Sequence, residues 1–215
     1  MALFFVLLPL RGSLSGAPAE SKGEDSVVDN VQRNYDAIVD FTAVFRQERE
    51  VKTLKRTIKA RGRLSFKRPG KMLWSYDEPK GEWVLADGKN FYYYQPEQRQ
   101  VLKSPLKGAF RSDIPLSFLL GIGNLKKDFK VTVKGREKEN YVLDLAPRGG
   151  AEAEDEILLG VDRQAYDILW ARIRDAAGNT TAVYFSEIKK GVGLKDSLFS
   201  PKIPEGAEVV ELGSR

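Results

Sequence analysis

The side chains that most often carry out catalysis are missing from this chain. Its 215 residues include no histidine and no cysteine. A Ser-His-Asp triad, a thiol nucleophile, a disulfide framework and a Cys/His zinc site are therefore excluded. An enzyme with this sequence would depend on carboxylate, lysine or tyrosine chemistry. The sequence does not mark out a pair of acidic residues that would converge in a cleft.

One acidic run is the best candidate for a metal site. It consists of Glu152, Glu154, Asp155 and Glu156. A calcium loop needs oxygen ligands at a regular spacing, and this run does not have it. We interpret the run as a solvated loop, and the sequence predicts neither a metal nor another cofactor.

The stretch RGRLSFKRPGKMLWSY, from Arg61 to Tyr76, is a better candidate for a binding site. Its pattern predicts two β-strands joined by an Arg-Pro-Gly turn. One side of the stretch is basic and the other is apolar and aromatic. The basic side suits an anionic partner, whereas the apolar side either fills a core or binds an apolar ligand.

The overall charge limits the choice of partner. Lysine and arginine exceed aspartate and glutamate by five, and the signs are mixed along the chain. A nucleic-acid-binding protein more often gathers its cations in a dense run or on one face, so we expect no nucleic-acid partner. A weak attraction to anionic membrane surfaces stays open.

The N-terminus indicates export. The apolar run from Leu3 to Leu10 is too short to span a bilayer as a helix. Ala17-Pro18-Ala19 fits a small-x-small cleavage site, so residues 1–19 are predicted to be a secretory signal that lacks its basic beginning. An uncleaved anchor or a disordered tail is the alternative. Residues 20–215 would then form a single exported domain.

Periodicity predicts a mainly β fold with a few α-helices, of the α+β class. In residues 26–42 apolar side chains recur three and four positions apart, which indicates an amphipathic helix. Most of the chain after Phe41 instead alternates between apolar and polar residues, with turn signals at Asp87-Gly88 and Gly178-Asn179. We expect about nine to eleven strands in one large antiparallel sheet, curved or partly closed.

A second short helix interrupts the strands near residues 113–120. Pro115 suits its first turn and Gly121 its end. It is apolar on nearly every side, so it must lie over an apolar surface. Its apolar residues are Ile114, Leu116, Phe118, Leu119 and Leu120.

The predicted sheet has more inward-facing apolar residues than two short helices cover easily. A fully packed core is one outcome, and a cavity for an apolar ligand is the other. The candidates for this face are Leu64, Phe66, Met72, Trp74, Trp83, Leu85, Phe91, Tyr93, Phe129, Val131, Leu143, Leu145, Trp170, Val183 and Phe185.

An ordered set of motifs resembles the outer-membrane lipoprotein carrier family, LolA. The resemblance covers most of residues 26–212 and includes the closing segment LFSPKIPEGAEVVEL. Each motif is weak by itself, and the order makes the set moderately specific. The matching residues are Phe41, Phe45, Gln47, Gly62, Leu64, Arg68, Pro69, Trp74, Pro79, Asp87, Gly88, Tyr94, Pro96 and either Gln98 or Gln100.

The resemblance implies an incomplete β-barrel whose short helices form a lid over a hydrophobic cavity. It implies a monomeric, non-enzymatic periplasmic chaperone for acylated lipoproteins. The partners would be an inner-membrane ABC-type lipoprotein release complex and an outer-membrane acceptor lipoprotein. The acceptors need a lipidated cysteine after the signal, and this chain has no cysteine, which favours the soluble carrier. A lipid-sensing regulatory module of the same fold is the alternative.

The resemblance also gives Arg68 a role as a latch on the lid. In the family this arginine hydrogen-bonds to the lid-helix backbone in the closed state and releases it when lipid enters. A guanidinium suits the role because it can donate to several unpaired helix carbonyls at once. We expect its partners in the 113–120 helix. The alternative is a cation that faces solvent on a turn.

Overall fold

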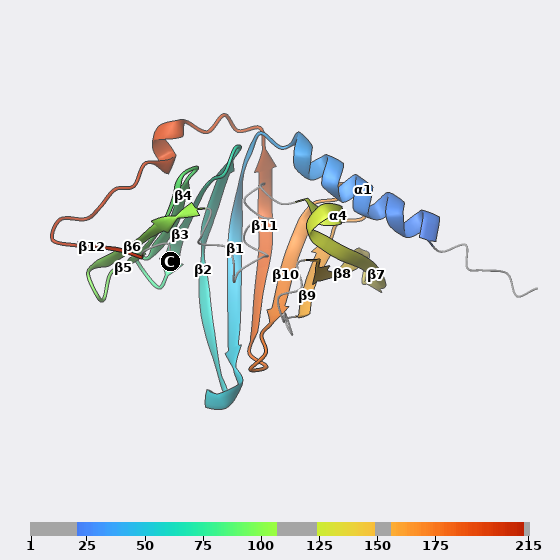
Figure 1. Ribbon diagram of the computed structural model, residues 1–215, viewed down its shortest axis with the longest axis horizontal. Coiled ribbons are helices and arrows are strands. Elements are labelled where there is room, and N and C mark those ends of the chain that lie inside the picture. Colours follow the sequence, from blue (N-terminus) through green and yellow to red (C-terminus); the bar gives the residue numbers. More distant parts are fainter. Residues whose placement is uncertain (1–20, 107–123, 149–155, 213–215) are drawn as a thin grey trace, which may run out of the picture.

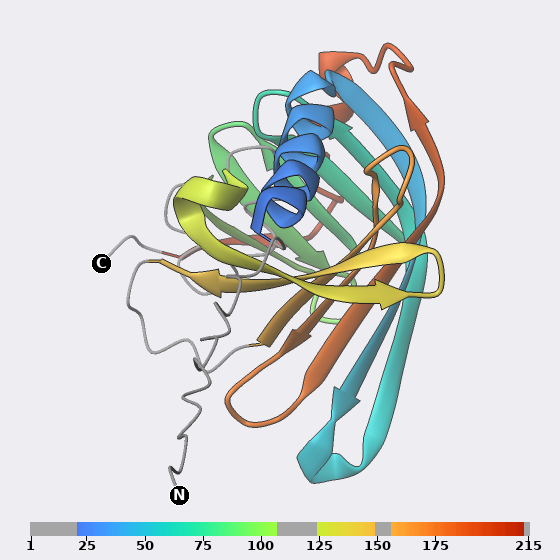
Figure 2. The same ribbon diagram turned by 90° about the vertical axis from the view of Figure 1, so that its right-hand side faces the viewer.

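A computed structural model describes residues 21–106, 124–148 and 156–212. These residues form a single twelve-stranded sheet that is strongly curved, with the long helix α1 lying on its concave side (Figures 1 and 2). The helical elements are α1 (Ser21–Ala37), η1 (Lys52–Leu54), α4 (Leu125–Asp128) and η2 (Asp196–Phe199). The strands are β1 (Asp40–Val51), β2 (Arg56–Lys67), β3 (Lys71–Glu78), β4 (Trp83–Asp87), β5 (Asn90–Gln95), β6 (Gln100–Pro105), β7 (Phe129–Glu137), β8 (Asn140–Pro147), β9 (Glu156–Val161), β10 (Ile168–Arg174), β11 (Thr180–Lys190) and β12 (Glu208–Glu211).

The sheet consists of two antiparallel meanders joined at one seam. The strand order is β12-β6-β5-β4-β3-β2-β1-β11-β10-β9-β8-β7. The first meander runs from β1 to β6 and the second from β7 to β11. Strands β1 and β11 join them through antiparallel pairing that extends from Phe41 opposite Lys190 to Glu50 opposite Thr180. A strand from near the start of the chain therefore lies at the centre of the sheet.

The turn chemistry expected from the sequence is confirmed. Gly88 has φ +95° and Gly178 has φ +79° in the two hairpin turns, a conformation that glycine adopts without strain. The carboxylate of Asp87 accepts hydrogen bonds from the backbone N–H groups of Lys89 and Asn90, both at 2.7 Å. These local bonds fix the β4–β5 turn.

The number and direction of the strands differ from the prediction. The described ranges contain twelve strands rather than about nine to eleven, and β12 pairs with β6 in parallel, with Val209 opposite Val101. Strand β12 has only four residues and is mostly exposed. Its sequence has little alternation, so only the neighbouring β6 edge makes it a strand.

The first helix lies earlier in the chain than residues 26–42. Ser26, the first residue of the expected helix, is inside α1 and donates from Oγ to the Gly23 carbonyl at 2.7 Å. At the other end, Asp40 already belongs to β1. Its buried carboxylate accepts backbone N–H groups of Val192 at 2.7 Å and Leu194 at 2.8 Å. The helix ends early because Asp40 binds the segment after β11, and the period of the sequence does not record such a long-range contact.

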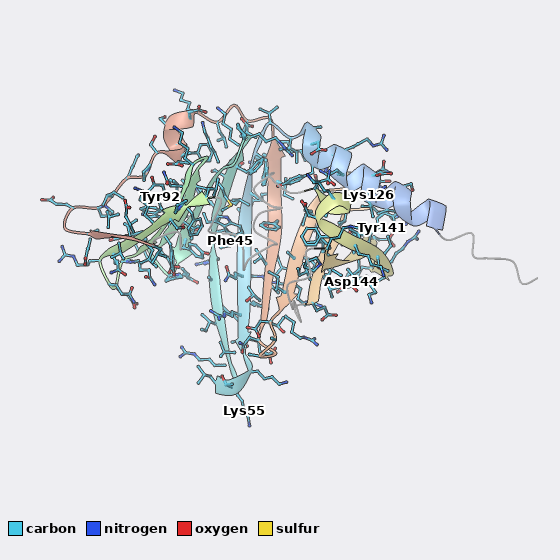
Figure 3. All side chains as sticks on the ribbon, viewed as in Figure 1. Phe45, Lys55, Tyr92, Lys126, Tyr141 and Asp144 are labelled. Carbon is cyan, nitrogen blue, oxygen red and sulfur yellow. The ribbon has the colours of Figure 1, made fainter. Side chains whose placement is uncertain are left out.

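Two apolar clusters occupy the concave side. One gathers the buried face of α1 against β7 to β10. The other lies over β1 to β4 and centres on Phe45. The centroid of the Phe45 ring lies 4.6 Å from that of Trp74 and 5.0 Å from that of Tyr76, and both pairs are edge to face. Such rings stabilise through buried area and through their geometry. Phe45 is fully buried near the middle of the sheet (Figure 3).

We expect Gly62→Ala to lower the free energy of unfolding by about 3 kcal/mol, the upper end for overpacking. A Cβ at Gly62 would lie 2.0 Å from the Ser75 carbonyl oxygen, and this backbone atom cannot rotate away. Urea unfolding measures the change. Gly23→Ala is the control, because nothing lies within 4 Å of its added Cβ. Equal stability of both variants would contradict the close approach of β2 and β3.

Candidate functional site: the concave face under α1

Helix α1 presents an apolar stripe to the sheet. Its spacing of three and four residues places these side chains on one face, and all are at least nine-tenths buried. The members of the stripe are Val27, Val28, Val31 and Tyr35, and Ile38 continues it directly after the end of the helix. The helix therefore covers the concave face over the second meander (Figure 2).

A small apolar pocket lies between α1 and the sheet. Its volume is ≈ 40 Å³. It is lined by Val31, Asn34, Tyr35, Ile38, Phe41, Leu64, Tyr166, Asp167, Ile168, Phe185 and Ile188. A water occupies about 30 Å³ of liquid volume, so the pocket as it stands is far too small for a long hydrocarbon chain.

Polar side chains tie the rim of this pocket together. The Asn34 amide donates to the Tyr166 carbonyl at 3.0 Å and to the Asp167 carboxylate at 2.9 Å. Lys190 donates to the Asn34 side-chain oxygen at 3.0 Å and forms an ion pair with Asp167. The floor under α1 is thus apolar, while its edge is held by hydrogen bonds that water can replace.

Arg68 grips the C-terminal end of α1. Its Nε donates to the Ile38 carbonyl at 3.0 Å, and its Nη2 donates to the Tyr35 carbonyl at 2.9 Å. The same Nη2 lies 3.4 Å from the Asp36 carboxylate, and the guanidinium lies over the Tyr35 ring at 5.3 Å. Helix ends leave carbonyls without a partner inside the helix. Here one side chain from the β2–β3 turn donates to the Tyr35 carbonyl, which also accepts from the Ile38 N–H, and to the Ile38 carbonyl just after the helix.

The 113–120 helix, expected as the partner of Arg68, lies outside the described residues. So do the predicted lid residues Ile114, Leu116, Phe118, Leu119 and Leu120. Among the described residues, the hydrogen bonds of Arg68 reach α1. The Arg-Pro-Gly turn therefore meets the end of the first helix, which the sequence did not indicate.

A second, more polar cleft lies on the concave side of β1 to β5, with a volume of ≈ 510 Å³. It is lined by Gln47, Arg49, Ile58, Lys59, Ala60, Tyr76, Pro79, Glu82, Val84, Phe91 and Tyr93. Tyr93 donates from its hydroxyl to Glu82 at 2.7 Å. Burial, followed by this bond and the charge of Glu82, raises the pKa of Tyr93 to about 12. Burial also raises the pKa of Tyr76.

Strand alternation places twelve of the fifteen candidate residues on the concave side. Leu64 and Phe185 line the pocket under α1, and Phe91 and Tyr93 line the polar cleft. The other eight belong to the two concave clusters or pack against them. They are Phe66, Met72, Trp74, Phe129, Val131, Leu143, Leu145 and Val183.

Trp83, Leu85 and Trp170 are on the opposite, convex face, so their assignment to the cavity is wrong. Trp83 and Leu85 belong to a third cluster, which includes Ala207 of the C-terminal segment. Trp170 covers Gly160, where an added Cβ would lie 1.9 Å from the indole. These strands are apolar on both faces, and a residue type alone cannot tell which face is concave.

Asn34 of α1 and four pocket residues outside this helix were missed by the sequence analysis. Tyr166, Asp167 and Ile168 lie in and after the β9–β10 turn, and Ile188 lies beside a β-bulge in β11. A bulge shifts the alternation by one residue. The period of a regular strand therefore does not predict that the side chains in this turn and beside this bulge point into the pocket.

These observations define a class of protein: an open, curved and mostly antiparallel sheet whose apolar concave face is partly covered by a helix. A family model for the outer membrane lipoprotein carrier protein LolA matches residues 37–202. The chain belongs to this LolA family, whose members are transport chaperones rather than enzymes.

Relatives in other bacteria extend the match over nearly the whole chain. A protein of Cupriavidus taiwanensis named outer-membrane lipoprotein carrier protein is 31% identical over 91% of this chain and 90% of its own length. One of the same name from Nitrosomonas europaea is 29% identical over 97% of this chain and 98% of its own. The similarity thus includes α1 and the C-terminal segment.

Solved structures with the same fold are much more distant in sequence. An uncharacterized conserved protein from Thermus thermophilus has a TM-score of 0.55 and 15% identity, over 87% of this chain and 98% of that chain. A putative outer membrane lipoprotein-sorting protein domain from Vibrio parahaemolyticus has a TM-score of 0.50 and 13% identity, over 83% and 96%. At such identities the likeness concerns the fold alone.

The described residues contain neither a helix suited to span a membrane nor a cluster of possible metal ligands. None of their helices combines the length and the apolar character that a membrane crossing requires. No three acidic side chains among them are grouped so as to hold a metal ion.

We expect Tyr93→Phe to reduce the loss of stability at alkaline pH. A tyrosine whose folded pKa is raised stabilises the fold below its ordinary pKa of about 10. This contribution disappears as the pH rises from 10 towards 12, because the unfolded chain ionises first. Urea unfolding between these two pH values should show a smaller fall for Tyr93→Phe than for the natural chain. Equal falls would contradict the half-buried Tyr93–Glu82 contact.

Proposed function

We propose that this protein is a periplasmic carrier that takes the acyl chains of lipoproteins under α1. The observation that carries the proposal is the apolar floor beneath a helix whose end is held by Arg68. Family membership supports the same function. The cargo would be lipoproteins released from the inner membrane and delivered to the outer membrane.

The energetics of acyl chains explain why such a carrier needs partners at both ends. Each buried methylene contributes about 0.8 kcal/mol, so two or three long chains represent tens of kcal/mol in water. Release into water would be negligibly slow. An inner-membrane ABC-type release complex and an outer-membrane acceptor lipoprotein would therefore exchange cargo with the carrier by direct contact.

The small pocket makes this structure a closed state of the proposed carrier. Acyl chains need far more room than ≈ 40 Å³, so α1 must move away from the sheet for cargo to enter. The ties of α1 at the rim and at Arg68 are polar. Charge-assisted hydrogen bonds are worth about 1.5–3 kcal/mol each, which can bias such a movement without preventing it.

Native mass spectrometry of the protein purified from the periplasm tests the function directly. We expect a fraction of the molecules to carry triacylated lipoprotein, because cargo cannot escape into water. Blocking the acceptor step should raise that fraction. A protein that stays empty in a host with an active release complex would contradict the carrier function.

We expect Arg68→Leu to load cargo but to transfer it at least about tenfold more slowly. Without its hydrogen bonds to Tyr35 and Ile38, the closed state that expels cargo loses several kcal/mol at about 1.5–3 kcal/mol per bond. A transfer assay to purified acceptor measures the rate. Arg63→Leu on the preceding strand β2 is the control, since Arg63 is exposed. Equal transfer by the two variants would remove the latch role.

A further inference from the structure

The hairpin formed by β1 and β2 extends beyond the rest of the sheet. We call residues 49–59 the hairpin tip; they include the end of β1, η1 and the start of β2. Figures 1 and 2 show that the tip projects away from α1, and Figure 3 labels Lys55 at its far end. Every residue from Lys52 to Lys59 is exposed, so the tip is a surface that the fold itself does not use.

The tip is strongly basic. It carries five cations and a single acid, Glu50. Two other acids near the tip are already engaged, because Glu48 pairs with Arg46 at 2.6 Å and Lys59 at 3.8 Å, and Asp175 accepts hydrogen bonds from Asn179 at 2.8 Å. The cations are Arg49, Lys52, Lys55, Arg56 and Lys59.

Two aliphatic side chains stand exposed among these cations. Leu54 is 69% exposed and Ile58 is 47% exposed. Leu54 is in η1, which has no buried residue, so neither folding nor packing accounts for a large aliphatic side chain there. Cations that surround exposed apolar side chains are the composition of a membrane-surface segment.

The tip is fixed in position by the neighbouring hairpin. The Lys52 backbone N–H donates to the Asn179 side chain at 3.0 Å, and Asn179 is held in turn by Asp175 at 2.8 Å. The Lys52 side chain also lies over Gly178, 3.1 Å from where a Cβ would be. The β10–β11 turn therefore braces η1, and the exposed residues are presented on a rigid support.

We propose that the hairpin tip docks the protein on an anionic phospholipid surface, with the cations at the headgroups and Leu54 in the interface. This proposal goes beyond the carriage of cargo, since it concerns the projecting end of the β1–β2 hairpin and not the apolar floor under α1. Charge complementarity with an anionic leaflet provides the attraction. Leu54 adds a short-range hydrophobic contribution that holds the tip once it has arrived.

The shape of the tip favours a lipid surface over a folded protein. A specific protein interface buries about 800 Å² on each partner, and a narrow, convex tip offers little of that area. Lipid headgroups adjust to a convex object. A membrane contact at the tip would also affect the concave face, because Arg49, Ile58 and Lys59 of the tip line the polar cleft. Docking through the tip would bring this end of the concave face to the membrane.

Vesicle sedimentation of the cargo-free full chain tests the proposal. We expect binding to vesicles of phosphatidylcholine with phosphatidylglycerol at low salt, and little binding to phosphatidylcholine alone. The triple variant Lys52→Gln, Lys55→Gln and Arg56→Gln should bind the anionic vesicles about 100-fold more weakly, because each cation near such a surface contributes about a factor of five.

A matched triple variant separates the tip from net charge. Lys130→Gln, Lys189→Gln and Lys202→Gln removes the same charge from exposed positions in β7, β11 and the C-terminal segment. Lys189 pairs opposite Thr42, at the other end of β1 from the tip. If this control weakens binding as much as the tip variant does, or if neutral vesicles bind equally well, the proposal is wrong.

A single fluorescent label reports whether Leu54 enters the interface. The chain has no cysteine, so Leu54→Cys accepts one environment-sensitive dye at a unique site. We expect its emission to shift to the blue and brighten on anionic vesicles. The same dye at Val192→Cys, an exposed aliphatic position just after β11, should not change. No change at Leu54, or an equal change at both sites, would overturn the proposal.

These experiments test the carrier function and the membrane docking of the hairpin tip independently of each other. Vesicle binding is measured without lipoprotein, so it does not depend on the carrier function. A tip variant that loses vesicle binding but still carries triacylated lipoprotein from the periplasm would support both. A natural chain that carries lipoprotein but binds no anionic vesicles would leave the carrier function intact and overturn only the docking surface.

Discussion

The contact between the apolar face of α1 and the concave side of the sheet is the interaction on which the rest of the structure depends. It buries Val31 and Tyr35 against strands that are distant in sequence. It also brings the end of the helix to the β2–β3 turn, where Arg68 meets it. Without this contact, the sheet would expose a large apolar surface to water, a state that soluble proteins avoid.

The way in which α1 is held fits a helix that moves. Apolar contacts under it are non-directional and tolerate a change of partner, whereas the contacts at its edge are individual hydrogen bonds. Asn34, Asp167, Lys190 and Arg68 provide these bonds. In the proposed carrier, these few polar ties are the directional contacts that α1 would break on leaving the apolar floor and form again on its return.

The concave side changes its chemistry along its length. Beneath α1 it is apolar and nearly filled, and over the first meander it passes through the rings around Phe45 to a cleft lined by Glu82, Tyr93 and Arg49. One curved sheet therefore provides a place for hydrocarbon and a place for polar groups. The basic hairpin tip continues the polar end outward, so apolar burial and surface charge are kept apart.

The sequence by itself determined the elements and the family. Alternation along β2 and β3, the turn glycines Gly88 and Gly178, and the ordered motifs around Arg68 are local signals, because period and turn conformation depend on neighbouring residues. Only the tertiary structure decided which face of a strand is concave, as the convex Trp170 shows. It also decided that Arg68 holds α1, since this contact joins segments thirty residues apart. Such long-range choices depend on which surfaces meet, and a local pattern does not record that.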